Sequence, residues 1–198
     1  MSHTAGTAQG HETCAVEAER TEKGAAHIPP GQGARSLWVM GLLVTYKVPS
    51  HTTGGAYSLF EVATQPGTGP PPHIHHREDE AFYVLEGTYE FLNGREIRRA
   101  TAGSLIYIPK GTLHAHRVVG EGVGRMLVTQ TPGGLYERFF EEVGEEATGD
   151  VFTALLEEGS PEAARIASIA ARYGIEIALP AGRAKWRHSS RPNRPIDS

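Results

Sequence analysis

Cysteine is almost missing from this sequence of 198 residues, because Cys14 is the only one. A single thiol cannot form an intrachain disulfide, nor can it build a thiolate cluster for zinc or iron–sulfur. Long apolar runs are missing as well: no segment approaches the ~18 apolar residues of a membrane span, and the first part of the chain lacks the apolar core of a signal peptide. These absences favour a reducing compartment, and the cytoplasm is the expected location.

Positive charge is in slight deficit, with 19 Lys and Arg against 23 Asp and Glu, so the formal net charge is −4. The sequence therefore lacks the basic field that attracts nucleic acid or an anionic membrane surface, and the expected partner is a small molecule. The length, the 39% hydrophobic content and the 21% charged content are typical of one globular domain with tails.

Large apolar side chains are rare at both ends of the chain. Residues 1–34 are rich in Gly, Ala, Thr and Glu and end in a Pro/Gly cluster at 29–33, which predicts a flexible N-terminal arm. Residues 183–198 mix Arg, Ser and Pro without periodicity and are interpreted as a second mobile tail. The folded part is expected between residues 35 and 182.

Residues 35–131 have a pattern typical of β-structure. Short runs of β-branched and aromatic residues, such as 42–46 and 57–62, are separated by Gly, Pro and Asn. Asn93-Gly94 predicts a hairpin with a type I′ turn, in which both residues have positive φ and the flanking strands are antiparallel. The spacing of the runs predicts a sandwich or a barrel.

Beyond this region, over residues 132–182, the apolar period becomes helical. Leu135, Phe139 and Phe140 fall on one face of a predicted helix. The charged residues of the same segment can face water: Glu137, Arg138, Glu141 and Glu142.

Two more helices are predicted in this segment. One covers 151–158, and the other begins with Ser160 as N-cap and Pro161 at the first position and ends at Gly174. We expect the helical segment to pack on the β-rich domain.

Five of the ten histidines form two groups inside the β-rich region: His73, His75, His76, His114 and His116. Residues two apart on a strand point to the same face, so His73 and His75 can present two imidazoles to one point. Glu80 precedes a β-prone run, and alternation places its carboxylate on the interior face with Phe82 and Val84. A lone buried carboxylate is costly, so a cation is its natural compensation.

His114 follows a turn at 109–111 and completes a set of three imidazoles and one carboxylate: His73, His75, Glu80 and His114. This mixed N/O set suits Fe, Mn, Co, Ni or Zn as divalent ions, and it suits Ca(II), Mg(II) and Cu(I) less well. Four protein ligands leave one or two positions open on a metal that accepts five or six, as in catalytic sites. We predict one divalent transition-metal ion per chain.

The other two histidines of the groups have simpler explanations. His76 is adjacent to His75 on the strand and is expected to face solvent. His116 shares the face of His114. It could line the pocket or support the ligands, or it could only pack in the core, and the sequence leaves both possibilities open. We expect His116 and Phe82 to line the pocket or support the ligands.

Two motifs of fixed spacing contain these residues. In the first, Gly, five residues, His-x-His, four residues, Glu, six residues and Gly are matched by Gly67, His73, His75, Glu80 and Gly87. In the second, Gly, five residues, Pro-x-Gly, two residues and His are matched by Gly103, Pro109, Gly111 and His114. These are the motifs of the cupin superfamily, which the sequence resembles. Val118 stands where the second motif has an Asn that is not a metal ligand.

The resemblance implies a jelly-roll β-barrel over residues 35–131 with a metal ion near its centre and, commonly, a homodimer. The prolines at 70–72 and the segment 132–141 are similar to small bacterial monocupins related to quercetin dioxygenases.

This likeness favours a metal-dependent dioxygenase that acts on a small enolic or phenolic substrate, with Glu80 as the catalytic base. Two alternatives stay open. One is a redox-neutral isomerase or decarboxylase, in which Glu80 or His116 moves the proton. The other is a metal-bound protein that binds a small ligand without turnover.

Overall fold

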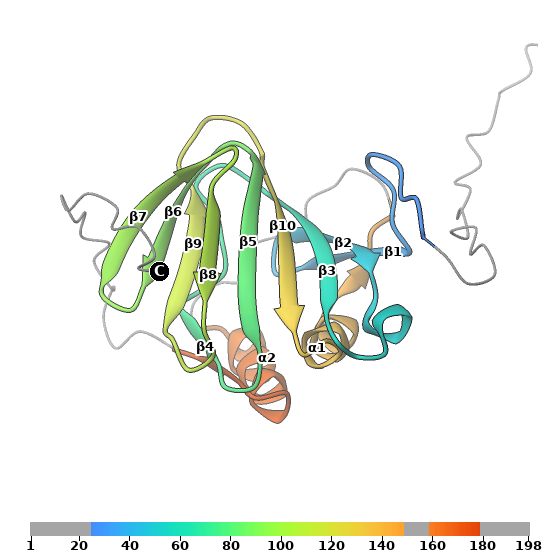
Figure 1. Cartoon of the computed structure of the whole chain (residues 1–198). Helices are drawn as coiled ribbons and strands as arrows, with labels where there is room; N and C mark the ends of the chain where they lie inside the picture. The colour runs from blue at the N-terminus through green and yellow to red at the C-terminus, as the bar shows by residue number, and fades with distance from the viewer. Residues whose placement is uncertain (1–24, 149–158, 179–198) are drawn as a thin grey trace, which may run out of the picture.

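The computed structural model describes residues 25–148 and 159–178, which form two facing antiparallel sheets with two helices at one end (Figure 1). Residues 25–34 of the predicted arm contain neither helix nor strand. The rest of that arm, the tail at 183–198 and the helix predicted at 151–158 lie outside the described residues. The domain boundaries drawn from the sequence stay predictions.

The larger sheet has seven strands in the order β11-β1-β2-β3-β10-β5-β8. Neighbouring strands in it are antiparallel throughout. Their bounds are β1 Arg35–Val39, β2 Leu42–Val48, β3 Ser58–Thr64, β5 Asp79–Glu86, β8 Leu105–Ile108, β10 Gly124–Thr131 and β11 Glu145–Glu146.

The smaller sheet has five strands in the order β12-β4-β9-β6-β7, again antiparallel. Their bounds are β4 His73–His75, β6 Thr88–Asn93, β7 Glu96–Thr101, β9 His114–Val118 and β12 Ile175–Ile177. A short 3-10 helix, η1, covers Ser50–Thr53.

The jelly-roll prediction is confirmed, but the two sheets do not close into a barrel. Within the described residues, the edge strands β8 and β7 each pair with one neighbour, β5 and β6 respectively, and no ladder joins them. Period-two alternation specifies which face of each strand is buried, and it carries no information on whether edge strands pair. The jelly-roll is therefore an open one, with two facing sheets in place of a closed barrel.

The core lies between the sheets and is built by alternation along the strands. On β5, Phe82 and Val84 are buried, whereas Tyr83 and Leu85 on the outer face are 44% and 41% exposed. Inward-facing residues of the other strands complete the core, among them Phe60, Tyr89, Phe91 and Met126. This packing places one inner face of each sheet opposite the other.

The predicted hairpin at Asn93-Gly94 is present, since β6 and β7 pair antiparallel with Asn93 opposite Glu96. The turn differs from the expectation. Gly94 has φ of 61°, and Met40 is the only non-glycine residue with positive φ in the described part of the chain. The turn residues are thus Gly94 and Arg95, with Gly at the first central position, as type II′ turns require.

Helix α1 covers Leu135–Val143 and buries Phe139 and Phe140, as its apolar period predicts. Glu137 was expected to face water, but it is buried. Its carboxylate accepts hydrogen bonds from the backbone N–H of Ser50, at 2.6 Å, and from the Ser50 hydroxyl. Two donors from η1 thus replace the water that this carboxylate would otherwise need.

Helix α2 covers Pro161–Arg172, and the Ser160 side chain accepts a hydrogen bond from the Ala163 N–H at 3.1 Å, which confirms the predicted N-cap. Gly174 has φ of 80° and ends the helix before β12, which pairs with β4. Strands β11 and β12 were not predicted, because they have only two and three residues. None of the described helices is long and apolar enough to cross a membrane.

Candidate metal centre

The three histidines of the predicted ligand set come from two neighbouring strands of the five-stranded sheet. His73 and His75 on β4 are both buried, as their spacing predicts, while Ile74 between them is partly exposed. The single ladder pair between β4 and β9 joins His73 to His114. Strand pairing alone therefore brings three imidazoles together, with ring centroids 4.2 to 5.6 Å apart.

The carboxylate of the set reaches across from the other sheet. Glu80 on β5 is 2% exposed, and its Oε2 lies 2.6 Å from His114 Nε2 and 3.5 Å from His75 Nε2. One ligand atom from each of His73, His75, Glu80 and His114 lies within 4.8 Å of all the others. Atoms bound to one ion at about 2.1 Å are about 3–4 Å apart, so these four residues could hold a metal ion.

The imidazoles present their Nε2 atoms to this cluster because their Nδ1 atoms are engaged elsewhere. Nδ1 of His73 lies 2.9 Å from the Pro71 carbonyl oxygen, and Nδ1 of His114 lies 2.9 Å from the Thr112 carbonyl oxygen. A carbonyl can only accept, so both rings carry a proton on Nδ1, and in the neutral form of each ring Nε2 has a free lone pair. This is the tautomer that a metal ligand needs.

Within the described residues, four atoms in the cluster have no hydrogen-bond partner: Nε2 of His73, His75 and His114, and Oε2 of Glu80. Buried polar atoms without a partner are rare. Moreover, the lone pair of His114 Nε2 faces a carboxylate oxygen at 2.6 Å, and two acceptors at that distance repel unless a proton or a cation lies between them. The donor set therefore fits a divalent cation.

The ionisation of the cluster is consistent with that fit. Burial, reinforced by His114 and His75, lowers the pKa of His73 well below its usual range, which keeps the ring neutral. Burial by itself would raise the pKa of Glu80, but the adjacent imidazoles of His75 and His114 outweigh it and lower the pKa below its usual range. The cluster thus combines an ionised carboxylate with an imidazole able to donate its lone pair.

Gln130 fixes the orientation of Glu80. This β10 side chain is fully buried, and its Nε2 donates a hydrogen bond to Glu80 Oε1 at 2.7 Å. The ladder places Gln130 directly opposite Glu80. Because Oε1 is engaged by Gln130, Oε2 is the oxygen that faces the imidazoles.

Glu78 has a similar relation to His75. Its side chain is 1% exposed; Oε2 lies 3.4 Å from His75 Nδ1, and Oε1 accepts a hydrogen bond from the Tyr136 N–H at 3.1 Å. The Tyr136 ring packs edge-on against His75, with centroids 4.7 Å apart. The first turn of α1 is therefore in contact with a candidate ligand.

Gln130, Glu78 and Tyr136 were not among the site residues predicted from the sequence. Glu78 was open to prediction, because it precedes Glu80 by two residues and alternation places both on the same face. Gln130 and Tyr136 carried no such signal, since their roles depend on which strand and which helix lie beside β5 and β4.

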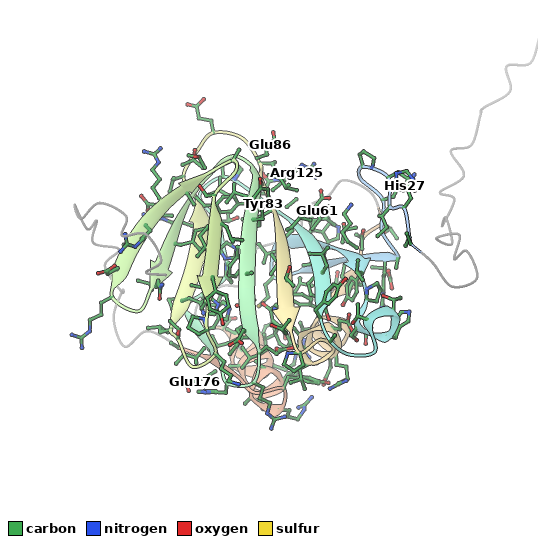
Figure 2. All side chains as sticks on the ribbon, viewed as in Figure 1. His27, Glu61, Tyr83, Glu86, Arg125 and Glu176 are labelled. Atoms are coloured by element: carbon green, nitrogen blue, oxygen red, sulfur yellow. The ribbon has the colours of Figure 1, made fainter. Side chains whose placement is uncertain are left out.

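His76 and Glu176 lie on the solvent side of this region. The His76 side chain is exposed, as predicted, and its Nε2 lies 3.0 Å from Glu176 Oε2. Figure 2 shows Glu176 at the end of the molecule opposite Glu86 and Arg125. Since β12 pairs with β4, the candidate ligands lie toward the Glu176 end, where the helices also lie (Figure 1).

A pocket between the sheets adjoins the cluster, and it includes both pocket residues predicted from the sequence, Phe82 and His116. Its polar lining comes from His73, Glu80, His116 and Tyr136. The remaining walls are apolar: Leu42, Val44, Phe60, Val62, Pro70, Phe82, Val128 and Phe140. Among the described residues, neither Lys nor Arg lines the pocket.

His116 is a buried polar side chain of this pocket wall. It is 5% exposed, and burial lowers its pKa to about 3, so the ring is neutral. Neither ring nitrogen has a hydrogen-bond partner among the described residues.

The family model for the cupin domain matches residues 60–130, a segment that runs from β3 to β10 and includes all four candidate ligands. The chain thus contains a cupin domain. The resemblance read from the two motifs is thereby confirmed at the level of the superfamily. No curated protein matches the sequence.

Solved structures similar to this chain include proteins of several kinds. KdgF from Halomonas sp. is 22% identical over 48% of this chain and 81% of its own, with a TM-score of 0.44. A predicted oxalate decarboxylase from Thermotoga maritima is 18% identical over 46% and 80%, with a TM-score of 0.44. A recombinant oxalate oxidase in complex with glycolate is 29% identical over 48% and 54%, with a TM-score of 0.41. At these scores the similarities do not identify an activity.

Proposed function

We propose that this cupin is a metal-dependent dioxygenase that acts on a small enolic or phenolic substrate. The observation that carries the proposal is the position of the four-residue cluster at the wall of an apolar pocket, with Glu80 and His73 belonging to both. A substrate in that pocket would meet the cluster directly. When bound there, a divalent ion would supply Lewis acidity that lowers the pKa of a substrate hydroxyl group.

The lining of the pocket favours this substrate class. Each charged group of a sugar phosphate or a dicarboxylate needs a cationic partner when it leaves water, and apart from a bound ion the described lining of the pocket contains neither Lys nor Arg. Aromatic and aliphatic walls such as Phe60, Phe82 and Val128 instead suit a flat, uncharged molecule. Enols and phenols combine such an apolar body with a hydroxyl group that can ionise at the cluster.

Glu80 is the proposed catalytic base. Its Oε1 is held by Gln130 at 2.7 Å, so Oε2 is left to face the cluster and the pocket. A carboxylate in that position can accept the proton of the substrate hydroxyl group. The four ligand candidates thus include one group that serves both binding and proton transfer.

A dioxygenase reaction needs no co-reductant, since both atoms of O2 enter the substrate and the electrons that reduce O2 come from the substrate. The pocket therefore has to accommodate O2 and one organic molecule only. The redox-neutral alternatives, an isomerase or a decarboxylase, use the same proton transfer at Glu80 without O2.

The test combines metal analysis with oxygen consumption. Protein purified without added metal is analysed for Fe, Ni, Mn, Co and Zn, and is then assayed in an oxygen electrode with a flavonol and with a small diketone. We expect one divalent ion per chain and loss of one O2 per substrate consumed. Equal turnover under strictly anaerobic conditions would contradict a dioxygenase and support the redox-neutral reading. Binding of the ion without turnover of either compound, in air or without it, would contradict both.

A further inference from the structure

His116 differs from every other buried histidine in the described part of the chain. His73 and His114 each engage a backbone carbonyl through Nδ1, and His75 approaches Glu78. His116 is buried to the same degree, but both of its ring nitrogens lack a hydrogen-bond partner. Buried polar groups almost always have one, so this imidazole has unused hydrogen-bonding capacity inside the protein.

The surroundings of His116 cannot use that capacity. Its ring packs against three aromatic rings, those of Phe82, Tyr89 and Phe91, with centroids 5.5 to 5.9 Å away. Contacts of this kind suit a phenylalanine as well as a histidine. Packing therefore explains the aromatic ring at position 116 and leaves its two nitrogens unexplained.

The position of His116 relative to the cluster supplies an explanation. His114 and His116 are both buried and lie on the same face of β9, one pleat or about 6.6 Å apart along the strand. His114 faces Glu80, and His116 lines the same pocket as Glu80 and His73. The polar groups of the pocket thus belong to the four-residue cluster, to Tyr136 and to His116, and the remaining walls are apolar.

We propose that His116 is the specificity-determining residue of the pocket: it selects enols or phenols that carry a second uncharged oxygen function, a hydroxyl or a carbonyl, away from the oxygen held at the cluster. This inference rests on the proposed function, because it assumes that the substrate is held at the cluster. A neutral imidazole has one donor and one acceptor, so it can bond either a hydroxyl or a carbonyl. A substrate that lacks the second oxygen leaves the two nitrogens unpaired and loses that contribution to binding.

Binding under anaerobic conditions tests the inference without requiring turnover. The probes are phenol and the three dihydroxybenzenes, catechol, resorcinol and hydroquinone, in which the second hydroxyl group moves progressively away from the first. Dissociation constants are measured on the metal-loaded protein by fluorescence or calorimetric titration. We expect at least one dihydroxybenzene to bind about five- to tenfold more tightly than phenol, the gain typical of one added hydrogen bond.

The decisive variants are His116→Phe and His116→Leu, either of which removes both nitrogens and keeps an apolar group among the aromatic rings. Each should erase the preference for the dihydroxybenzene and change the affinity for phenol by less than about twofold, while His116→Gln should restore part of the preference. The control Phe82→Leu alters the same wall without removing a polar atom, and it should shift all four affinities by a common factor. Metal content per chain verifies that the cluster is intact in each variant.

The results separate this inference from the proposed function. If His116→Phe or His116→Leu keeps the wild-type preference, or if none of the four compounds binds to the metal-loaded protein, the role of His116 is refuted. If the preference depends on His116 but no O2 is consumed with these compounds, with the flavonol or with the diketone, the dioxygenase proposal fails while the selective role of His116 stands.

Discussion

The two sheets contribute to the candidate metal centre in different ways. The five-stranded sheet supplies the three imidazoles from β4 and β9, and the ladder pair His73–His114 sets their spacing. The seven-stranded sheet supplies Glu80 from β5 and the Gln130 amide that orients it from β10. Nitrogen ligands are thus positioned by strand pairing within one sheet, whereas the carboxylate depends on how closely the sheets pack. We therefore propose a division of labour in which the five-stranded sheet contributes most of the metal affinity and the seven-stranded sheet contributes the catalytic base.

Removal of an imidazole should have the largest effect on metal binding. His73→Ala, His75→Ala or His114→Ala should each reduce metal affinity by more than about 100-fold, because loss of a supporting group behind a ligand already costs 10–100-fold. The fold should persist, since the strands bury their own apolar faces. Metal content by mass spectrometry and far-UV circular dichroism measure the two quantities.

The matched control for these variants is His76→Ala, which removes an exposed imidazole adjacent to His75. It should retain its metal. Normal metal content in any of the three ligand variants would refute the assignment of that histidine.

Glu80→Gln tests the contribution of the other sheet. The substitution keeps the shape and a carbonyl donor but removes the negative charge and the basicity, so metal affinity should fall less than in the histidine variants. Turnover per bound metal should fall by about 10²- to 10⁴-fold, the typical contribution of general base catalysis. Metal content and rate are measured on the same sample. A normal rate per bound metal would make Glu80 a ligand only, and the division of labour between the sheets would be lost.

Gln130→Leu removes the hydrogen bond to Glu80 Oε1 without adding a charge. The carboxylate is then free to rotate, and metal affinity should fall by about tenfold, at the lower end of the range for groups that orient ligands. Competition with a chelator of known affinity measures the change. Thr129→Ala, on the same strand but only partly buried, is the control and should bind metal normally. An unchanged affinity in Gln130→Leu would show that packing alone orients Glu80.

Glu78→Gln should have the smallest effect. The amide keeps an oxygen for the Tyr136 N–H and removes only the negative charge near His75 Nδ1, which lies at 3.4 Å. We expect a loss of metal affinity of less than about tenfold. Asp79→Asn removes the neighbouring carboxylate, which contacts the Lys110 N–H instead, and should leave the affinity unchanged. If Glu78→Gln lowered the affinity more than Gln130→Leu, the imidazoles would depend on their supporting group more than Glu80 does.

Much of the fold could be predicted because its signals are local. Alternation identified the buried faces of β4 and β5, and the Ser160-Pro161 pair identified the start of α2. The same signals gave no correct prediction where a residue contacts a segment that is distant in the sequence. Glu137 looked like a surface residue on its own helix, yet η1 covers it through Ser50. Strand β12 has three residues, too few to show a period, and exists because β4 offers it a partner.

The candidate ligands likewise combine features predicted from the sequence with features that depend on distant contacts. The sequence by itself determined that His73 and His75 share a face, that Glu80 points inward and that His114 follows a turn, since strand periodicity and turn chemistry are properties of adjacent residues. Only the tertiary structure decided that β9 lies beside β4, that Gln130 lies opposite Glu80, and that the two nitrogens of His116 have no hydrogen-bond partner among the described residues. These facts depend on contacts between residues far apart in the chain, and local sequence patterns do not encode which of the possible contacts form.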